Sequence, residues 1–152
     1  MESSIKLDDL DRYILLSLQN DGKQKYEDIA NNRGRSKSTI ANRIQRMINN
    51  GIISNWTIQV NPEMIGFDLT VIISIQINVP YLDEINKELI KIPELVAIYN
   101  VTGNYDITAV GRFRNRQHLD KTIHRIIGIP NIQRTSSNLA LRTIKEDFKV
   151  YF

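Results

Sequence analysis

The stretch from Ser36 to Asn50 holds the side chains best suited to contact another macromolecule. At 100° per residue, one side of a helix over this stretch is apolar and carries Ile40, Ile44, Met47 and Ile48. The opposite side is polar and carries Ser38, Asn42, Gln45, Arg46 and Asn49. Amides, hydroxyls and guanidinium groups without a carboxylate suit an anionic partner that has hydrogen-bonding edges. The major groove of DNA is such a partner, so we interpret the stretch as a DNA-recognition helix.

Positive charge is concentrated around this helix, although the net charge of the 152-residue chain is only +3. No Asp or Glu lies between Ile29 and Pro62, whereas residues 63–152 hold 11 basic and 10 acidic residues. The cations of the first region are Arg33, Arg35, Lys37, Arg43 and Arg46. Neutralisation of phosphates requires clustering of this kind, so a nucleic-acid partner is expected.

The position of each polar side chain along the helix suggests its role. Residues early in a recognition helix lie deepest in the groove, so Ser38, Thr39 and Asn42 are the expected base contacts, beside the capping Ser36. Arg43 and Arg46 are expected to contact guanine edges or phosphates. The expected phosphate contacts are Arg33, Arg35 and Lys37. Simple solvation is the alternative for Asn42 and for the two arginines of the turn.

Three helices are expected before residue 52. Asp8 caps a helix over residues 8–19, residues 26–32 form a second one, and Ser36 and Gly51 mark the ends of the third. Residues 33–35 form the tight turn before the third helix. Residues 52–60 are rich in β-branched side chains and predict a strand or a short hairpin. Together these elements predict a winged helix-turn-helix domain over residues 1–62.

A different rhythm begins after the boundary predicted at residues 61–66. Apolar side chains alternate from Leu69 to Val79, which predicts a strand with one apolar face. Helices are expected over residues 81–91 and 117–127, and further strands over 95–101, 107–113 and 131–144. This βαββαβ order predicts an antiparallel sheet with both helices on one face, so residues 63–152 form a second domain of an α+β chain. Because Ile72, Val96 and Ile98 add apolar surface, we expect self-association to bury the second face of the sheet.

Other classes of protein are disfavoured by what the sequence lacks. Without cysteine there are no disulfides, thiolate nucleophiles or cysteine metal sites, and no apolar run reaches the ~18 residues of a membrane span. The start does not have the pattern of a secretory signal, so a cytoplasmic location is expected. His118 and His124 do not share a helix face, and we expect both to be solvated. We therefore expect no enzyme, no bound metal and no cofactor.

Several short motifs occur in a recognisable order. They are Leu7-Asp8-x-x-Asp11, Ser36-x-Ser38-Thr39-Ile40-x-x-Arg43-Ile44, Gly51-Ile52-Ile53, Gly66 and Thr102-Gly103-x-Tyr105-Asp106. With these motifs the chain resembles the Lrp/AsnC family of feast/famine transcriptional regulators over nearly its whole length. The resemblance implies an N-terminal winged helix-turn-helix domain and a C-terminal ligand-sensing domain with a ferredoxin-like fold.

The resemblance also implies homodimers paired through their sheets and often assembled into octamers, with an amino acid bound between dimers. The loop of Gly103, Asn104, Tyr105 and Asp106 would hold the effector, because a zwitterion needs donors for its carboxylate and acceptors for its ammonium group. Small hydroxyl residues of the last strand would complete the pocket from a neighbouring subunit; they are Thr135, Ser136 and Ser137. The alternative for the loop is an ordinary turn with a buried, hydrogen-bonded Asp106.

One departure from the family pattern lies in the turn before the recognition helix. Arg35 stands where the family usually has a small apolar residue, so we expect a looser turn with an added phosphate contact. The expected function is a sequence-specific DNA-binding transcriptional regulator whose DNA binding or oligomerisation responds to an amino acid. The alternative is a ligand-independent architectural protein that coats DNA.

Overall fold

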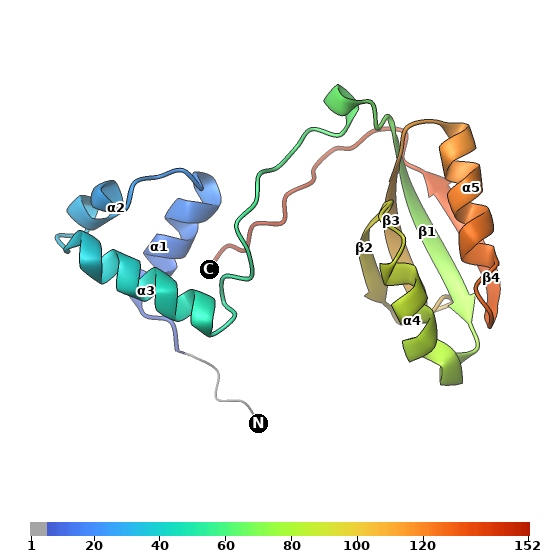
Figure 1. The fold of residues 1–152 in the computed structure, drawn as a ribbon, viewed down its shortest axis with the longest axis horizontal. Coiled ribbons are helices and arrows are strands. Elements are labelled where there is room, and N and C mark those ends of the chain that lie inside the picture. The colour runs from blue at the N-terminus through green and yellow to red at the C-terminus, as the bar shows by residue number, and fades with distance from the viewer. Residues whose placement is uncertain (1–5) are drawn as a thin grey trace. The chain divides into compact units, whose positions relative to one another are not determined.

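A computed structural model describes residues 6–152 (Figure 1). Their backbone forms two compact units. The first unit contains residues up to 59 together with residues 146–152, and the second contains Val60–Lys145. The expected boundary, between residues 62 and 63, lies three residues from this division. The end of the chain, which the sequence assigns to the second domain, is grouped with the first unit.

Three helices form the first unit: α1 (Asp9–Asn20), α2 (Tyr26–Asn32) and α3 (Lys37–Asn49). Each begins and ends within one residue of the range expected from the sequence. Their buried side chains share one core, which comprises Ile14, Leu15, Leu18, Ile29, Ala30, Ile40, Ile44 and Met47. The predicted apolar side of α3 is therefore the side that packs on the other two helices.

The turn between α2 and α3 is closed by two backbone hydrogen bonds. Gly34 has φ of 59° and donates its N–H to the carbonyl of Asn31 at 3.3 Å, and the N–H of Arg35 reaches the carbonyl of Ala30 at 2.9 Å. This pair of bonds is a Schellman motif, which satisfies the last carbonyls of α2. The looser turn expected from Arg35 is wrong, because the backbone closes the turn and the Arg35 side chain remains exposed.

The strand or hairpin expected over residues 52–60 is also wrong. A second Schellman motif at Gly51 ends α3, and the chain then runs from residue 54 to residue 61 without helix or strand. A strand needs a neighbouring backbone to complete its hydrogen bonds. No strand within residues 6–152 pairs with this segment, and Trp56 and Ile58 are exposed. The helix-turn-helix part of the prediction is confirmed; the wing is not formed.

The second unit has the predicted βαββαβ order. Its elements are β1 (Leu69–Ile77), α4 (Leu82–Ile90), β2 (Leu95–Asn100), β3 (Ile107–Phe113), α5 (Arg116–Ile127) and β4 (Ile132–Leu139), with short 3₁₀ turns at Glu63–Ile65 and Val79–Tyr81. The strands lie in the order β2-β3-β1-β4 and every neighbouring pair is antiparallel. Helices α4 and α5 cover one face of the sheet (Figure 1).

The alternation predicted along β1 defines the two faces of this sheet. Val71, Ile73 and Ile75 are fully buried beneath the helices, together with Phe113 of β3. The expectation for Ile98 is wrong, because that side chain packs against the same core. The other face has no helix, and its exposed apolar side chains include Ile72 and Tyr99.

The last strand is shorter than expected. β4 ends at Leu139, which lies opposite Val71, and the N–H of Ala140 still reaches the carbonyl of Thr70 at 2.9 Å. Beyond that point only Leu69 of β1 is left, so residues 140–152 continue without helix or strand. The apolar residues of 141–144 favoured a strand by composition, but a ladder partner decides where a strand ends.

Candidate nucleic-acid interface and effector loop

The exposed side of α3 presents uncharged hydrogen-bonding groups, with the exposed cations Lys37 and Arg46 beside them. The uncharged exposed side chains recur at spacings of four and three residues and are Ser38, Asn42, Gln45 and Asn49. We call these four residues the amide row. The Gln45 amide donates to Oδ1 of Asn49 at 2.8 Å, which orders two of its members. The predicted polar side of α3 is therefore formed, with amides in a position to meet base edges.

The start of α3 is held by hydroxyl groups. Oγ of Ser36 accepts from the Thr39 N–H at 3.1 Å, and it lies 2.8 Å from the hydroxyls of Ser38 and Thr39. This contact satisfies one of the free N–H groups of the first turn. Ser36 therefore acts as the N-cap, as predicted, and it groups the three hydroxyls that the sequence proposed for DNA contacts.

All three cations of α3 are paired with carboxylates from α1, its N-cap or α2. Lys37 lies 2.6 Å from Glu27, Arg43 lies 2.6 Å from Asp8, and Arg46 lies 2.6 Å from Asp11. The sequence segment around α3 contains no acid, and the tertiary structure brings the acids to it. The charge expected on α3 is therefore largely balanced within the first unit.

Asp11 lies at the centre of these ion pairs and has no exposed surface. Its carboxylate receives the Nη1 of Arg43 at 3.2 Å and the Nη2 of Arg46 at 2.6 Å. Asp8 and Asp11 also exchange hydrogen bonds as a capping box at the start of α1. The Asp11 N–H and the Arg43 guanidinium, in that order, lower the pKa of Asp8 from its usual 3.8 to about 2.

The two arginines of the turn are free of carboxylates in the contacts that the structure describes. The guanidinium of Arg33 stacks over the ring of Tyr13 at 4.3 Å, a cation–π contact that leaves its charge in place. The Arg35 side chain is exposed. Both therefore remain suited to phosphate contacts. Their role in binding stays a prediction.

The loop of residues 101–106 is anchored to the end of β1 through Asp106. Oδ2 of Asp106 accepts from the Ile77 N–H at 2.9 Å, and the Asp106 N–H donates to the carbonyl of Ile75 at 3.1 Å. The register of β1 against β4 shifts between Gln76 and Ile77, where this carboxylate takes up the backbone N–H. Gly103 has φ of 118°, a conformation that favours glycine. Asp106 therefore has at least a structural role in the loop.

The three hydroxyl residues of β4 do not share a face. Thr135 and Ser137 lie opposite Ile75 and Ile73, on the side covered by the helices, while Ser136 lies opposite Ser74 on the open side. β1 separates β4 from β3, so they are two strand spacings of ~4.8 Å apart. Within one chain, the effector residues predicted on the loop and on β4 are thus not gathered into one pocket.

Comparisons with protein families decide the class of this chain. Residues 7–48 match the AsnC-type helix-turn-helix domain, and residues 70–150 match the Lrp/AsnC ligand binding domain. The chain belongs to the Lrp/AsnC family. The family consists of transcriptional regulators and not of enzymes, which confirms both the recognition and the non-enzymatic class predicted from the sequence.

Relatives of this Lrp/AsnC chain match it over nearly its full length. An uncharacterised HTH-type transcriptional regulator of Pyrococcus horikoshii is 35% identical, covering 96% of this chain and 99% of the relative. The HTH-type transcriptional regulator FL11 of Pyrococcus furiosus is 34% identical, covering 92% and 93%. Among solved structures, Escherichia coli AsnC superimposes with a TM-score of 0.86 at 29% identity, covering 93% of this chain and 96% of that one. A feast or famine regulatory protein of M. tuberculosis complexed with L-methionine gives 0.88 at 27% identity, covering 95% and 99%.

Sequence reasoning missed a polar cluster in the ligand-binding unit of this Lrp/AsnC chain. His118 is half-buried rather than solvated: its Nδ1 accepts from the Arg114 N–H at 3.3 Å and its Nε2 lies 3.0 Å from Glu94. Because Nδ1 accepts, the neutral ring carries its proton on Nε2 and donates it to Glu94. Burial alone would raise the pKa of Glu94, but the His118 contact holds that pKa below its usual value. His124 is exposed, as expected. No sequence signal joins residues 94 and 118; only the fold does.

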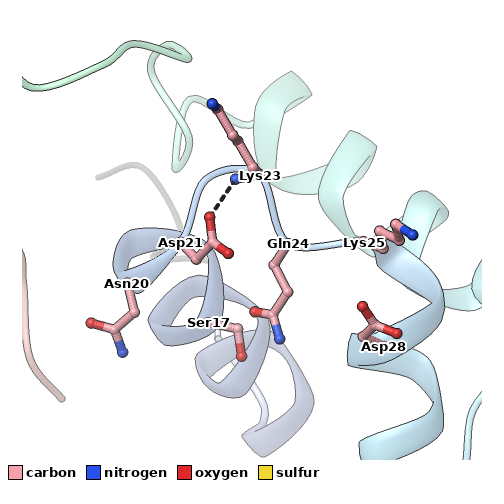
Figure 2. A pocket seen from close by; sticks show the side chains of 7 residues that line it. All are labelled: Ser17, Asn20, Asp21, Lys23, Gln24, Lys25 and Asp28. Carbon is pink, nitrogen blue, oxygen red and sulfur yellow. Dashed lines mark hydrogen bonds between the residues drawn. The ribbon is translucent and has the colours of Figure 1, made fainter.

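Two open hollows lie away from the predicted site residues. One, of about 640 Å³, lies beside the α1–α2 turn and is lined by Ser17, Asn20, Asp21, Lys23, Gln24, Lys25 and Asp28 (Figure 2). The Asp21 side chain accepts the Lys23 N–H there at 2.9 Å, and two lysines are balanced by two aspartates. The other, of about 300 Å³, lies between the C-terminal ends of α4 and α5.

Neither a metal cluster nor a bilayer-spanning helix is found in the part of the chain that the structure describes.

Proposed function

We propose that this chain is a sequence-specific DNA-binding regulator whose DNA binding or oligomerisation responds to an amino acid held between dimers. The observation that supports DNA recognition is the amide row, an exposed and uncharged set of hydrogen-bonding side chains on the second helix of a helix-turn-helix motif. Arg33 and Arg35 lie in the turn before the same helix and would add contacts to the DNA backbone, beside the capping Ser36, while Thr39 in the first turn would face base edges.

The effector site is proposed at the loop of Gly103, Asn104, Tyr105 and Asp106. Support comes from the match to a ligand binding domain and from the M. tuberculosis relative that carries L-methionine. The exposed loop has backbone groups and one carboxylate that suit a zwitterion. Thr135, Ser136 and Ser137 are not gathered with the loop in one chain, so they would have to come from a neighbouring subunit.

Self-association is proposed through the open face of the sheet. Ile72 on this face is 42% exposed and Tyr99 is 51% exposed, and the helices cover only the opposite face. Apolar side chains gathered on an uncovered sheet face favour an interface between copies. Pairs formed in this way would be homodimers, assembled further to octamers. Sedimentation velocity tests the assembly, and a monomer at micromolar concentration contradicts it.

The first experiment is a thermal melt of the purified chain against each of the twenty amino acids at millimolar concentration. An effector at 100 times its dissociation constant should stabilise the folded chain by ~2.7 kcal/mol if it binds only that state. We expect one or a few related amino acids to raise the melting temperature. If none does, the amino-acid response is refuted and a ligand-independent DNA-coating protein is favoured.

Substitution of Asp106 separates its structural role from effector binding. Asp106→Asn keeps an oxygen that can accept the Ile77 N–H but removes the charge that would meet an ammonium group. We therefore expect a melting temperature close to that of the wild type and a lost response to the effector. Asp83→Asn, at an exposed position in the first turn of α4, makes the same change of charge and should leave the response intact. An unchanged response in Asp106→Asn refutes the assignment.

Sequence specificity is tested by comparing the best duplex selected from a random pool with the unselected pool. A specific regulator should prefer the selected duplex by about 10³ or more. Equal affinity for both would support the coating protein instead.

A further inference from the structure

The pairing of α3 with α1 has a regular geometry. Arg43 and Arg46 are three residues apart on α3, and Asp8 and Asp11 are three residues apart at the start of α1. Residues at this spacing lie on one side of a helix or helix start. The two pairs therefore meet as two facing rows, in which Arg43 contacts both carboxylates and Arg46 contacts Asp11.

Together with the buried apolar side of α3, these contacts fix which way the exposed side of the helix faces. A rotation of α3 about its own axis would pull at least one guanidinium away from Asp11, whose carboxylate has no exposed surface and cannot regain water. Breaking one side of a buried charge pair is strongly unfavourable because the remaining charge is left without compensation. The amide row lies on the same helix, so the rotation of α3 sets the direction in which the row faces. The ion pairs therefore help to hold the row facing outward.

The cost of leaving the Asp11 carboxylate without a partner also sets the role of Arg43 and Arg46. A phosphate that took Arg46 from Asp11 would gain one charge-assisted hydrogen bond but would leave the buried carboxylate with fewer donors. Arg43 lies between two carboxylates and its side chain is 29% exposed; the Arg46 side chain is 44% exposed, but its Nη2 lies 2.6 Å from the buried Asp11. Both guanidinium groups are thus better satisfied inside the first unit than by a solvated DNA backbone.

We infer that Asp11 is a positioning residue for the recognition helix, and that Arg43 and Arg46 are committed to it rather than to DNA. The helix then enters the groove with its cations balanced by carboxylates of the first unit, and phosphate contacts come from cations outside it, such as Arg35. This inference rests on the DNA binding proposed above and revises the roles that the sequence suggested for Arg43 and Arg46.

The salt dependence of DNA binding distinguishes the two roles. Each phosphate neutralised by a cation adds about 0.9 to the slope of log K against log salt on double-stranded DNA. The full-length chain would be titrated against a fluorescent 30-base-pair duplex of arbitrary sequence between 50 and 200 mM KCl. We expect Arg46→Met to leave the slope unchanged and Arg35→Met to reduce it by about 0.9.

Asp11→Asn provides the converse test and keeps the shape of the side chain. With its charge removed, the two guanidinium groups are released toward phosphates, so the slope should steepen by up to about 1.8. The preference for a selected duplex over the unselected pool should also fall, because only the buried apolar side of α3 then holds its rotation. Asp9→Asn is the matched control: it changes the net charge equally in the same turn of α1, and Asp9 is exposed and has no ion pair among the described residues.

Each outcome decides the inference. The inference is overturned if the salt slope of Arg46→Met falls by about 0.9. It is also overturned if the salt slope of Asp11→Asn equals that of Asp9→Asn. If Arg46→Met does not fold, the comparison of the two Asp→Asn variants decides alone. A wild-type chain that shows no salt-dependent binding to any duplex overturns the proposed DNA binding instead, so the two failures are distinguishable.

Discussion

Gly111 in β3 is the position at which the structure allows the sharpest prediction about the ligand-binding unit. The ring of the fully buried Phe113 folds back over it: a Cβ built at Gly111 would lie 2.6 Å from Cε2 and Cζ of that ring and 3.5 Å from Cδ2 of Leu95. Gly111→Ala must therefore displace the ring of a fully buried residue. The ring also meets His118 edge-on at 5.7 Å, so its displacement should disturb the His118–Glu94 contact.

The expected cost is that of overpacking a core, ~1–3 kcal/mol. Reduced freedom of the unfolded chain offsets ~0.4–1 kcal/mol of that cost. At the midpoints of these two ranges the net loss is about 1.3 kcal/mol, which should lower the melting temperature of a unit of this size by roughly 5–10 °C. Urea unfolding and thermal melts followed by circular dichroism measure both quantities.

A second substitution tests whether the ring is the cause. Phe113→Leu removes the clashing atoms, so Gly111→Ala combined with Phe113→Leu should be more stable than the sum of the two single effects, by at least 0.5 kcal/mol. Gly22→Ala is the control, because its Cβ would meet only the Leu18 carbonyl at 3.8 Å. Additive single effects, or a Gly111→Ala chain as stable as the wild type, would refute this account of the core.

Two further predictions concern the first unit. The depressed pKa of Asp8 implies stabilisation that is complete above the usual value of 3.8 and is lost as the pH falls toward about 2. Urea unfolding between pH 5 and pH 2 should show this loss in the wild type and a smaller one in Asp8→Asn; identical pH profiles would contradict it. At the end of the chain, the backbone N–H and carbonyl of Val150 pair with the Gln19 amide at 2.8 and 2.9 Å. Gln19→Ala should raise the rate of hydrogen exchange at the Val150 amide about 2- to 10-fold, because the hydrogen bond of that amide is lost. The control Gln24→Ala should leave the rate unchanged. Equal exchange rates in the two variants would show that Gln19 does not hold Val150.

Local features of the sequence were sufficient for the helices and for the first three strands of the sheet. The spacing of Ile40, Ile44 and Met47 predicted the buried side of α3, and the alternation along β1 predicted the covered face of the sheet. Ser36 and Gly51 marked the ends of α3 because caps satisfy backbone groups only a few residues away. Each of these signals acts over one or two turns or strands, so it can be read along the chain.

Features that depend on a distant partner could not be read in this way. The end of β4 depends on where β1 runs out, and the absent wing depends on the lack of a pairing strand. His118 was expected in solvent because nothing near it in sequence indicates Glu94.

The charge of the recognition helix was the largest difference of this kind. Residues 29–62 contain cations without acids, and by composition alone that segment is strongly basic. The sequence by itself determined the helices, the βαββαβ order of the elements and the family motifs, because hydrophobic period and caps are local. Only the tertiary structure decided that Asp8 and Asp11 balance Arg43 and Arg46, because an ion pair across 35 residues forms through helix packing and leaves no periodic trace.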